Sequence, residues 1–374
     1  MMSRLESGSP SARSIPLVSV VVPAYQASGT IGRVLEALEA SDLPRRDWEL
    51  IVVDDASSDD TALLAAQHAD AVIRLPDAPR GPAYARNRGS ELARAPFVAF
   101  IDADVMVAPE TLRLLVEPIE RDPSIGTLSA MLDDGQSTPG ITTRYRNLRR
   151  HVHQRLHADE PEALWSGCCI VRRSLFQTAG HFDEWHFAGP QDEVREFGRR
   201  IVQAGYRVAA VPEVRATHLK RFGLRTLVGD IWRRRITHVR LAPQTARIHP
   251  RELLAILGIG LASAYLVIGR GSWAIAAAGA IALALLLDAP LFVFLLRRAG
   301  LAFALAAVPL HAAALVIHGL AHGAGVLLRH AIGAPRPDPT HEAYSEIGLK
   351  GWPPPPYRPK PADPRPAAAA GEPR

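Results

Sequence analysis

The sequence predicts an α/β domain with a mostly parallel sheet, followed by C-terminal transmembrane α-helices. Two observations support this prediction. Between residues 17 and 219, short apolar runs that are typical of buried strands alternate with segments of helical spacing. Between residues 253 and 328, long stretches carry almost no charged residues, which is typical of helices that cross a bilayer.

Strands and helices alternate at the start of the chain. The predicted strands cover residues 17–22, 49–53, 71–75 and 97–101. A helix is predicted at 81–93, and two further helical faces have apolar residues at positions 31, 34, 35 and 38 and at positions 112, 115, 116 and 119. In a sheet connected in this way, ligands lie beyond the carboxyl ends of the strands.

The composition excludes several classes of protein. Hydrophobic residues make up 48% of the 374 positions, so wholesale disorder is excluded. The two cysteines, Cys168 and Cys169, are adjacent and therefore poor disulfide partners, and no Cys/His cluster has zinc spacing. The net charge is +5, but the basic residues flank apolar spans and lack an aromatic stacking platform, so no nucleic-acid partner is predicted.

Three transmembrane helices are predicted, near residues 253–269, 273–296 and 301–328. The first and third lack Asp, Glu, Lys and Arg, and the second contains Asp288 as its single acidic residue. A bilayer core needs about 20 apolar residues per helix, and a buried helical core rarely needs uncharged stretches this long. The region 251–330 is therefore read as multi-pass.

The arginines predict the orientation of these helices. The residues before the first span include six arginines, at positions 233, 234, 235, 240, 247 and 251. The loop between the first two spans has only Arg270. The positive-inside rule therefore places residues 17–220 in the cytoplasm, on the inner face of the cell membrane. Arg329 and Arg336, beyond the third span, oppose this assignment.

Three other segments have distinct compositions. Residues 1–16 are polar and Ser-rich, and we expect them to be disordered, with no cleaved signal peptide. Residues 221–250 combine an apolar stripe with arginines, which is typical of a basic interfacial helix. Residues 334–374 are Pro-rich and are expected to be an extended or disordered tail.

Two carboxylates follow the predicted strand at 97–101. If the extended backbone continues, Asp102 and Asp104 face the same side. Hard divalent cations accept such carboxylate oxygens together with phosphate oxygens of a substrate. The alternative is a solvated acidic turn that caps the next helix, because an Asp-X-Asp triplet is a weak motif by itself.

A second acidic group follows the predicted strand at 49–53. Asp54 or Asp55 suits a hydrogen bond from a base or a ribose, although the polar residues after them also suit a helix cap. Arg86 and Arg88 lie shortly before the Asp102 pair. These two arginines either face phosphate groups or lie on a solvated helix.

Four segments, taken in order, resemble the family-two glycosyltransferases with the GT-A fold. They are VSVVVPAYQAS, WELIVVDDASSDDT, ARNRG and FVAFIDADV, all within residues 17–107. The resemblance implies a Rossmann-like, mostly parallel sheet in a catalytic domain at 17–220. Its nucleotide-sugar half would cover residues 17–131, and its acceptor half would cover residues 132–220.

The resemblance also implies a donor site. Pro23 and Tyr25 would line the nucleotide site, and Asp54 or Asp55 would contact the base. The donor would be a nucleotide-diphosphate sugar, because this family uses such donors.

A metal site is implied by the same resemblance. Asp102 and Asp104 match the family's DXD motif, which holds the ribose and the metal–diphosphate, with Mg²⁺ or Mn²⁺ as the cation. His218 and Arg221 resemble a His-basic element that some members place near the metal or the diphosphate. A structural role is the alternative for His218.

The acceptor half resembles the family in two further segments. WSGCCIVRRSLFQTAGHFDE resembles the acceptor segment, with His181 where a glycine is common. AGPQDEVREFGRRIVQAGYRV resembles the motif that opens a helix with the general base. Asp192 matches that base, although Gln191 replaces the usual Glu. Glu193 is the nearest substitute.

These features imply inverting transfer of a sugar to a hydroxyl of a lipid or lipid-linked saccharide acceptor, with Asp192 as the general base. A polyprenyl-phosphate glycosyltransferase and a polysaccharide synthase subunit are the enzymatic alternatives. A nucleotidyltransferase is disfavoured, because PAYQASGT after the first strand has no Lys or Arg. A degenerate membrane scaffold that binds nucleotide-sugar is the non-enzymatic alternative.

Three histidines lie on one face of the third predicted span. They are His311, His318 and His322, and polar residues inside a membrane are candidate functional sites. Packing against other spans, contact with a lipid head group and metal binding all remain open. Gly319 and Gly323 indicate close helix packing beside these histidines.

Overall fold

The computed structural model describes residues 15–76, 78–133, 140–160, 164–184, 193–241 and 247–334. Its centre is an eight-stranded sheet with the order β3-β2-β1-β4-β7-β6-β8-β5. The strands are β1 (Val18–Ala24), β2 (Trp48–Asp54), β3 (Ala71–Arg74), β4 (Phe97–Ile101), β5 (Val105–Val107), β6 (Ile125–Leu132), β7 (Cys168–Arg172) and β8 (Arg207–His218).

The first four strands of the sheet are parallel, and each corresponds to a strand predicted from the sequence. The rest of the sheet is mixed. Strand β7 is antiparallel to both β4 and β6, β5 is antiparallel to β8, and β6 and β8 run parallel. The prediction of a mostly parallel sheet is therefore confirmed for the half that contains the predicted strands.

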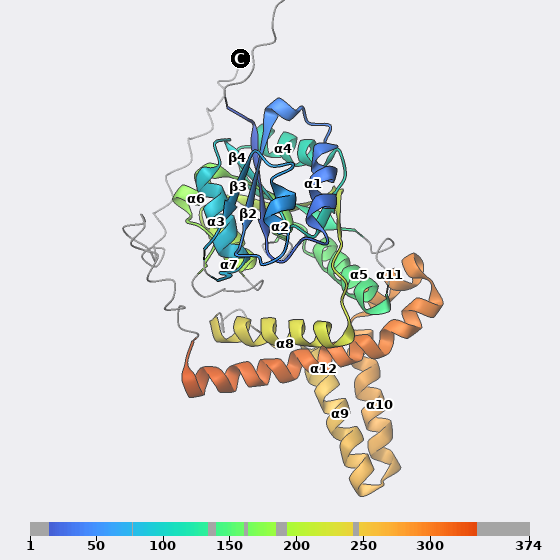
Figure 1. Ribbon diagram of the computed structural model, residues 1–374. Coiled ribbons are helices and arrows are strands. Elements are labelled where there is room, and N and C mark those ends of the chain that lie inside the picture. The colour runs from blue at the N-terminus through green and yellow to red at the C-terminus, as the bar shows by residue number, and fades with distance from the viewer. Residues whose placement is uncertain are drawn as a thin grey trace, which may run out of the picture.

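Helices cover both faces of this sheet (Figure 1). They are α1 (Ile31–Glu39), η1 (Arg45–Asp47), α2 (Thr61–Ala65), α3 (Pro82–Leu92), α4 (Thr111–Arg121), α5 (Ile141–Leu156), α6 (Arg173–Thr178) and α7 (Glu193–Gln203). Successive residues of a strand face opposite sides. Val20 and Val22 of β1 accordingly belong to the core under α1 and α4, whereas Val21 belongs to the core under α3 and α7.

Five helices follow the sheet. They are α8 (Leu224–Leu241), α9 (Pro250–Ile268), α10 (Gly271–Leu286), α11 (Ala289–Ala299) and α12 (Leu301–Ile332). Helices α9 and α10 form a hairpin that projects away from the sheet domain (Figure 1). Helices α8 and α12 run side by side between the domain and this hairpin, and Gly325 of α12 lies against Val239 of α8.

Two helices in the described ranges, α9 and α12, are long and apolar enough to cross a membrane. A third candidate arises only if α10 and α11 count as one segment, and these two helices are bent by 71°. The stretch predicted as one span, 273–296, is thus divided into two helices in the structure, and its crossing of a membrane stays a prediction. The chain turns at Asp288, whose carboxylate pairs with Arg251 and with His311, and Pro290 lies in the first turn of the new helix.

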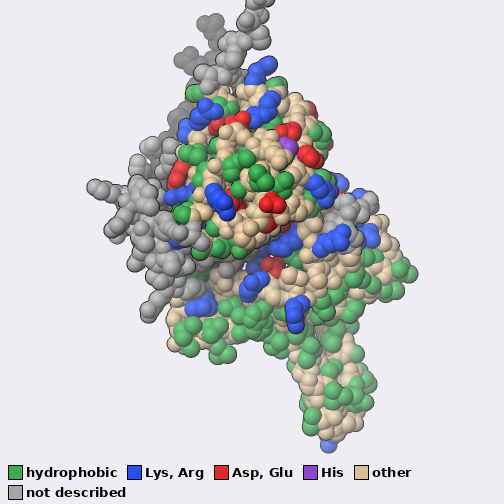
Figure 2. Space-filling view, in the orientation of Figure 1, with side chains coloured by type: hydrophobic (Ala, Val, Ile, Leu, Met, Phe, Trp, Pro, Cys, Tyr) green, Lys and Arg blue, Asp and Glu red, His purple; other side chains and the backbone are tan. Residues whose placement is uncertain are grey.

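The C-terminal helices expose many large apolar side chains. In Figure 2 these side chains cover the hairpin and the side of the α8–α12 layer that faces away from the domain. The most exposed of them include Leu266, Val267, Ile275, Leu286, Leu305 and Leu327. An apolar surface of this size is typical of a region that contacts lipid or another chain.

A test of the packing between α3 and β1 uses Gly89. A Cβ atom there would lie 2.3 Å from Cγ1 of Val21. We expect Gly89→Ala to lower the free energy of unfolding by about 1–3 kcal/mol, because overpacking strains a close-packed core. The matched control is Gly32→Ala in α1, where nothing lies within 4 Å of the new methyl group. Thermal unfolding of the two purified variants tests this expectation: Gly89→Ala should melt at a lower temperature than Gly32→Ala. Equal melting temperatures would contradict the close packing of α3 on β1.

Candidate active site

The loops after β1 and β2 brace one another at the carboxyl edge of the sheet. The backbone N–H of Gln26 donates to Oγ of Ser57 at 2.9 Å, and that of Asp55 donates to the carbonyl of Ala24 at 2.8 Å. Gln26 and Ala56 have φ values of 48° and 58°, which non-glycine residues rarely adopt. Strain of this kind persists only where the surroundings fix it, and it clusters at functional sites.

Asp54 and Asp55 have different surroundings. The Asp55 carboxylate accepts hydrogen bonds from the backbone N–H groups of Arg80 and Gly81, at 2.8 and 2.7 Å, and thereby holds the entry to α3. Burial raises the pKa of Asp55. Asp54 is fully buried. Its Oδ2 lies 3.5 Å from Nε of Arg74 but accepts no hydrogen bond. Asp54 therefore has an acceptor oxygen to spare.

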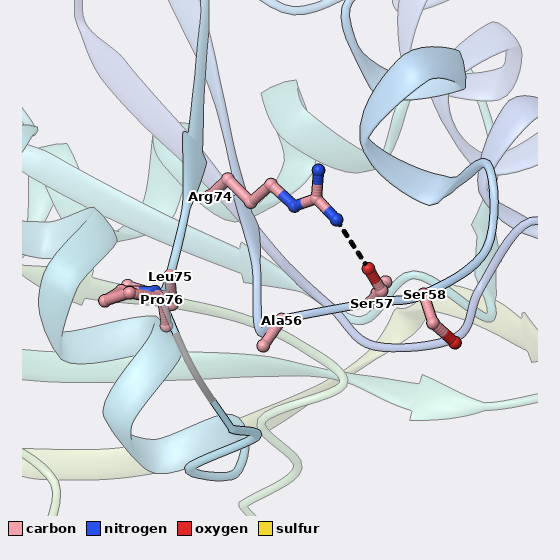
Figure 3. Close-up of a pocket in the computed structure, with 6 residues that line it drawn as sticks. All are labelled: Ala56, Ser57, Ser58, Arg74, Leu75 and Pro76. Atoms are coloured by element: carbon pink, nitrogen blue, oxygen red, sulfur yellow. Dashed lines mark hydrogen bonds between the residues drawn. The ribbon is translucent and has the colours of Figure 1, made fainter.

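An open hollow of about 480 Å³ lies where β2 and β3 end (Figure 3), and one of its lining residues, Arg74, is the ion-pair partner of Asp54. It is lined by Ala56, Ser57, Ser58, Arg74, Leu75 and Pro76. Across it, Nη2 of Arg74 donates to the Ser57 carbonyl at 2.9 Å. Of the other predicted donor-site residues, Pro23 lies within β1 opposite Val53, and Tyr25 is half exposed just after that strand.

Asp102 and Asp104 lie in a turn between β4 and β5. The turn is closed by a hydrogen bond from the backbone N–H of Val105 to the Asp102 carbonyl at 2.9 Å. The expectation of a continuing extended strand is therefore wrong. The turn gives each carboxylate its own partner: Asp102 pairs with Arg86 at 2.7 Å, and Oδ1 of Asp104 lies 3.7 Å from Nε2 of His218.

The Asp104–His218 pair is the part of this site that suits a divalent cation. Within the described ranges, no group of three or more His, Cys, Asp or Glu side chains is arranged to hold a metal. Burial raises the pKa of Asp104 and lowers that of His218. One carboxylate and one neutral imidazole fit Mn²⁺ or Mg²⁺ if phosphate oxygens of a substrate complete its coordination.

Arg86 does not face open space. Its side chain is 2% exposed, and its guanidinium lies between Asp102, at 2.7 Å, and Glu193, at 3.4 Å. The sequence left two roles open for Arg86, a contact with phosphate or a place on a solvated helix, and its burial shows that the second is wrong. In the structure Arg86 joins the turn after β4 to the first residue of α7.

The predicted general base, Asp192, lies outside the described residues, as does Gln191. Helix α7 begins at the next residue, Glu193, which is buried and paired with Arg86. Because that ion pair engages the Glu193 carboxylate inside the protein, Glu193 is poorly placed to replace Asp192 as a base.

Asn87 and Glu184 form a buried pair that sequence reasoning did not assign. The Asn87 amide donates to the Phe182 carbonyl at 2.9 Å and to Oε2 of Glu184 at 2.5 Å, and it accepts from the backbone N–H of Phe182 at 3.1 Å. These bonds hold the turn before α7 against α3. The asparagine of the ARNRG segment was the available signal for this contact.

Arg146 and Trp165 surround His218 and were also missed. The Trp165 ring stacks on His218 with centroids 6.5 Å apart, and a Cβ at Gly167 would lie 2.4 Å from that indole. The Arg146 guanidinium lies 3.9 Å from the Phe222 ring centre, and burial lowers the pKa of Arg146 to about 10. Arg146 also acts electrostatically on Asp104. No local pattern in α5 distinguishes this arginine from its neighbours.

Comparison with known proteins gives the same picture for the first half of the chain. Residues 19–180 match the family described as Glycosyl transferase family 2. The chain is 39% identical to succinoglycan biosynthesis protein ExoO of Rhizobium meliloti over 110 residues. This aligned segment covers 29% of this chain and 31% of ExoO. It is 31% identical to the uncharacterized glycosyltransferase EpsJ of Bacillus subtilis over 181 residues, and this aligned segment covers 46% of this chain and 52% of EpsJ.

Among solved structures, the chain is similar to mannosyltransferase PcManGT from Pyrobaculum calidifontis, which was solved in complex with GDP-Man and Mn²⁺. The TM-score is 0.54 at 22% identity, over 84% of this chain and 89% of that one. This likeness confirms the predicted GT-A fold. The matched segments span about a third to a half of the two curated relatives described above.

Glu184 generates a prediction about pH. Burial raises the pKa of its carboxyl group to about 7 from 4.5. The folded state therefore binds the proton more tightly than the unfolded state, and stability falls as the pH rises from about 4.5 through 7. We expect the wild type to lose on the order of 3 kcal/mol relative to Glu184→Gln across this window.

Melting temperatures of the full-length protein at pH 5 and pH 7.5 test this expectation. The control is Glu120→Gln, which changes an exposed glutamate on α4. If Glu184→Gln and the wild type shift in parallel with pH, as the control should, Glu184 does not carry the proton.

Proposed function

Since residues 19–180 belong to glycosyl transferase family 2, we propose that the protein transfers a sugar from a nucleotide-diphosphate sugar to a hydroxyl of a membrane-associated acceptor. One observation carries this proposal. Asp54, the Asp102–Asp104 turn and the start of α7 all lie at the carboxyl edge of one sheet, and Arg86 ties the last two together. This edge is where α/β sheets bind their ligands.

The nucleotide base is assigned to the hollow at the ends of β2 and β3, next to the Arg74–Asp54 ion pair. In this proposal Oδ2 of Asp54, which is ion-paired with Arg74 but accepts no hydrogen bond, accepts one from an N–H of the base. The hydroxyls of Ser57 and Ser58 line the same hollow and offer further polar contacts. Tyr25, half exposed after β1, offers a ring beside the nucleotide.

The diphosphate is assigned to the turn after β4. Asp104 and His218 would hold Mg²⁺ or Mn²⁺, and a cation bound there supplies positive charge that stabilises the leaving diphosphate. Arg146, whose charge already acts on Asp104, lies on the same side and adds to this positive field. Asp102 is held by Arg86, which leaves its second oxygen for a ribose hydroxyl.

Asp192 is the proposed general base. It accepts the proton of the acceptor hydroxyl while the oxygen attacks the anomeric carbon, and the bond to the diphosphate breaks with its electron pair on the departing oxygen. A single in-line displacement of this kind inverts the anomeric centre. The Arg86–Glu193 pair fixes the start of α7, immediately after Asp192, relative to the donor site.

The proposed location is the inner membrane, with the catalytic domain in the cytoplasm. Helix α9 has 19 residues, which at 1.5 Å per residue is about 28 Å, close to the thickness of a bilayer core. In this proposal the α9–α10 hairpin crosses the membrane and returns. The hairpin tip carries Arg270, whereas arginines are abundant on α8.

Helix α12 is proposed to lie along the membrane surface beside α8. The guanidinium of Arg329, near its end, donates to the carbonyl of Arg240 at the end of α8, and Arg240 in turn donates to the carbonyl of Gly333. The end of α12 is thus on the same side as the arginines that precede α9. Arg329, which opposed the predicted orientation, then supports it.

The base assignment is tested with Asp192→Asn. We expect this change to lower sugar transfer by about 10²–10⁴-fold, because the acceptor hydroxyl loses its proton acceptor. Binding of the nucleotide-sugar, followed by calorimetry, should be unchanged. Transfer at the wild-type rate would remove Asp192 from the mechanism, and a wild type that neither transfers nor hydrolyses any donor would favour the scaffold alternative.

The metal assignment is tested with Asp104→Asn. In the presence of Mn²⁺, we expect at least about tenfold weaker donor binding, because the neutral amide is a poorer cation ligand. Without Mn²⁺ the variant and the wild type should bind the donor alike. Asp159→Asn, an exposed position on another loop, is the matched control. An identical Mn²⁺ dependence in all three proteins would overturn the assignment.

A further inference from the structure

A group of cationic and imidazole side chains lies between the sheet domain and α12. Helix α5 contributes most of it, because its 16 residues contain no acidic side chain and five arginines, Arg144, Arg146, Arg149, Arg150 and Arg155. Figure 2 shows Lys and Arg side chains gathered between the domain and the lower helices. The reaction proposed above uses only Arg146, on the side of α5 that acts on Asp104.

Arg149 contacts His318 of α12. Nη2 of Arg149 lies 3.2 Å from Nε2 of His318. A guanidinium can only donate, so Nε2 accepts and the hydrogen of this imidazole is on Nδ1. Nδ1 of His318 is buried and has no hydrogen-bond partner. The contact therefore leaves one buried N–H donor without an acceptor, which is costly unless an acceptor is supplied.

His153, one turn further along α5, has a similar deficit. Its Nε2 is buried and without a partner, and its ring lies 4.6 Å from the ring of His157. Burial, together with the charges of Arg150 and Arg195, lowers the pKa of His153 to about 2. The ring is therefore neutral and offers one N–H or one lone pair to a ligand.

The charge around His318 is positive. The charged groups that act on it are Arg149, Arg195, Arg235 and Arg251. Arg235 pairs with Glu252 at 3.2 Å, and Arg251 pairs with Asp288. Arg149 has no carboxylate partner among the described residues. A guanidinium without a carboxylate, beside buried imidazole groups, is suited to bind an anion with several oxygen atoms.

The positions of Arg195 and His318 indicate which kind of anion would bind between α5 and α12. Arg195 lies on the first turn of α7, three residues after Asp192, and His318 lies on the helix that packs along α8 and the base of the α9–α10 hairpin. An anion bound here would lie close to Arg195, whose charge acts on both His318 and His153, and close to the helices that expose apolar side chains. The phosphate that links a lipid to its sugar fits this position, because its charge would lie near Arg195 while its lipid lies along the apolar surface.

We propose that Arg149 and His318, flanked by His153 and Arg195, bind the phosphate group of a lipid-linked acceptor. The proposal rests on the function proposed above and specifies its acceptor class. Two other sources have the same chemistry, namely free phosphate and the head group of a bulk phospholipid, and the experiment has an arm for each.

The experiment measures binding to the full-length protein in nanodiscs of phosphatidylcholine. Farnesyl diphosphate is the probe, farnesol is its uncharged counterpart, and inorganic diphosphate is its head group alone. We expect farnesyl diphosphate to bind at least about tenfold more tightly than either, because only it has both the anion and the apolar chain. Added phosphatidylglycerol should not compete.

Two variants locate the site. Arg149→Gln and His318→Phe should each weaken the binding of farnesyl diphosphate by about tenfold or more and leave farnesol binding unchanged. Arg149→Lys should retain part of the affinity, because it keeps the charge and loses the two-pronged donor. Arg297→Gln, at an exposed arginine of α11, is the matched control.

The outcomes separate this proposal from the proposed function. Equal affinity for farnesol and farnesyl diphosphate in the wild type overturns the phosphate site and requires no variant. So does tight binding that survives in both Arg149→Gln and His318→Phe, or full displacement by phosphatidylglycerol. If farnesyl diphosphate binds as expected but no nucleotide-sugar is turned over, the site stands and the proposed transferase activity fails. If Arg149→Gln transfers sugar to a neutral glycolipid at full rate, the proposed transferase activity stands and the phosphate site is overturned.

Discussion

The candidate site depends on one buried guanidinium. Arg86 is almost fully enclosed, and its charge is balanced by Asp102 on one side and Glu193 on the other. A buried ion pair adds little net stability, but loss of one partner leaves a charge that costs about 3–5 kcal/mol. The turn after β4 and the first residue of α7 are 91 positions apart in the sequence. Because neither carboxylate can move away from Arg86 without that cost, the turn after β4 and the start of α7 keep a fixed relation.

A second polar network performs a similar role among the C-terminal helices. Tyr145 of α5 is 2.8 Å from Nδ1 of His311, whose Nε2 is 2.7 Å from Asp288, and Asp288 also binds Arg251 of α9. Four helices or helix ends thus meet on one imidazole–carboxylate pair. In surroundings of low polarity such groups must satisfy one another, so their geometry is strongly constrained. The turn of the chain at Asp288 follows from this demand, which hydropathy alone does not reveal.

Local patterns predicted β1 to β4 and α1, because a fully buried strand and an amphipathic helix leave clear signatures in composition and spacing. The same patterns predicted that Asp54, Asp102 and Asp104 lie at the carboxyl edge of the sheet, where the structure has them. Strand β7 was not predicted to separate β4 from β6, since pairing between distant strands has no local signal. The same holds for Arg86: a helical position and a basic side chain were visible, whereas its two carboxylate partners depend on tertiary structure.

The three histidines of α12 show how a shared face can divide into separate roles. Spacing alone left packing, lipid contact and metal binding open for all of them. In the structure, His311 lies between Tyr145 and Asp288, and His318 accepts from Arg149. Both contacts reach α5, the helix that also carries Arg146, whose charge interacts with that of Asp104. Helix α5 therefore lies between α12 and the turn that carries Asp104, with contacts or charge interactions to both. The C-terminal helices and the carboxyl edge of the sheet are thus connected through α5, and in the proposed function this connection links an acceptor in the bilayer to the site of transfer.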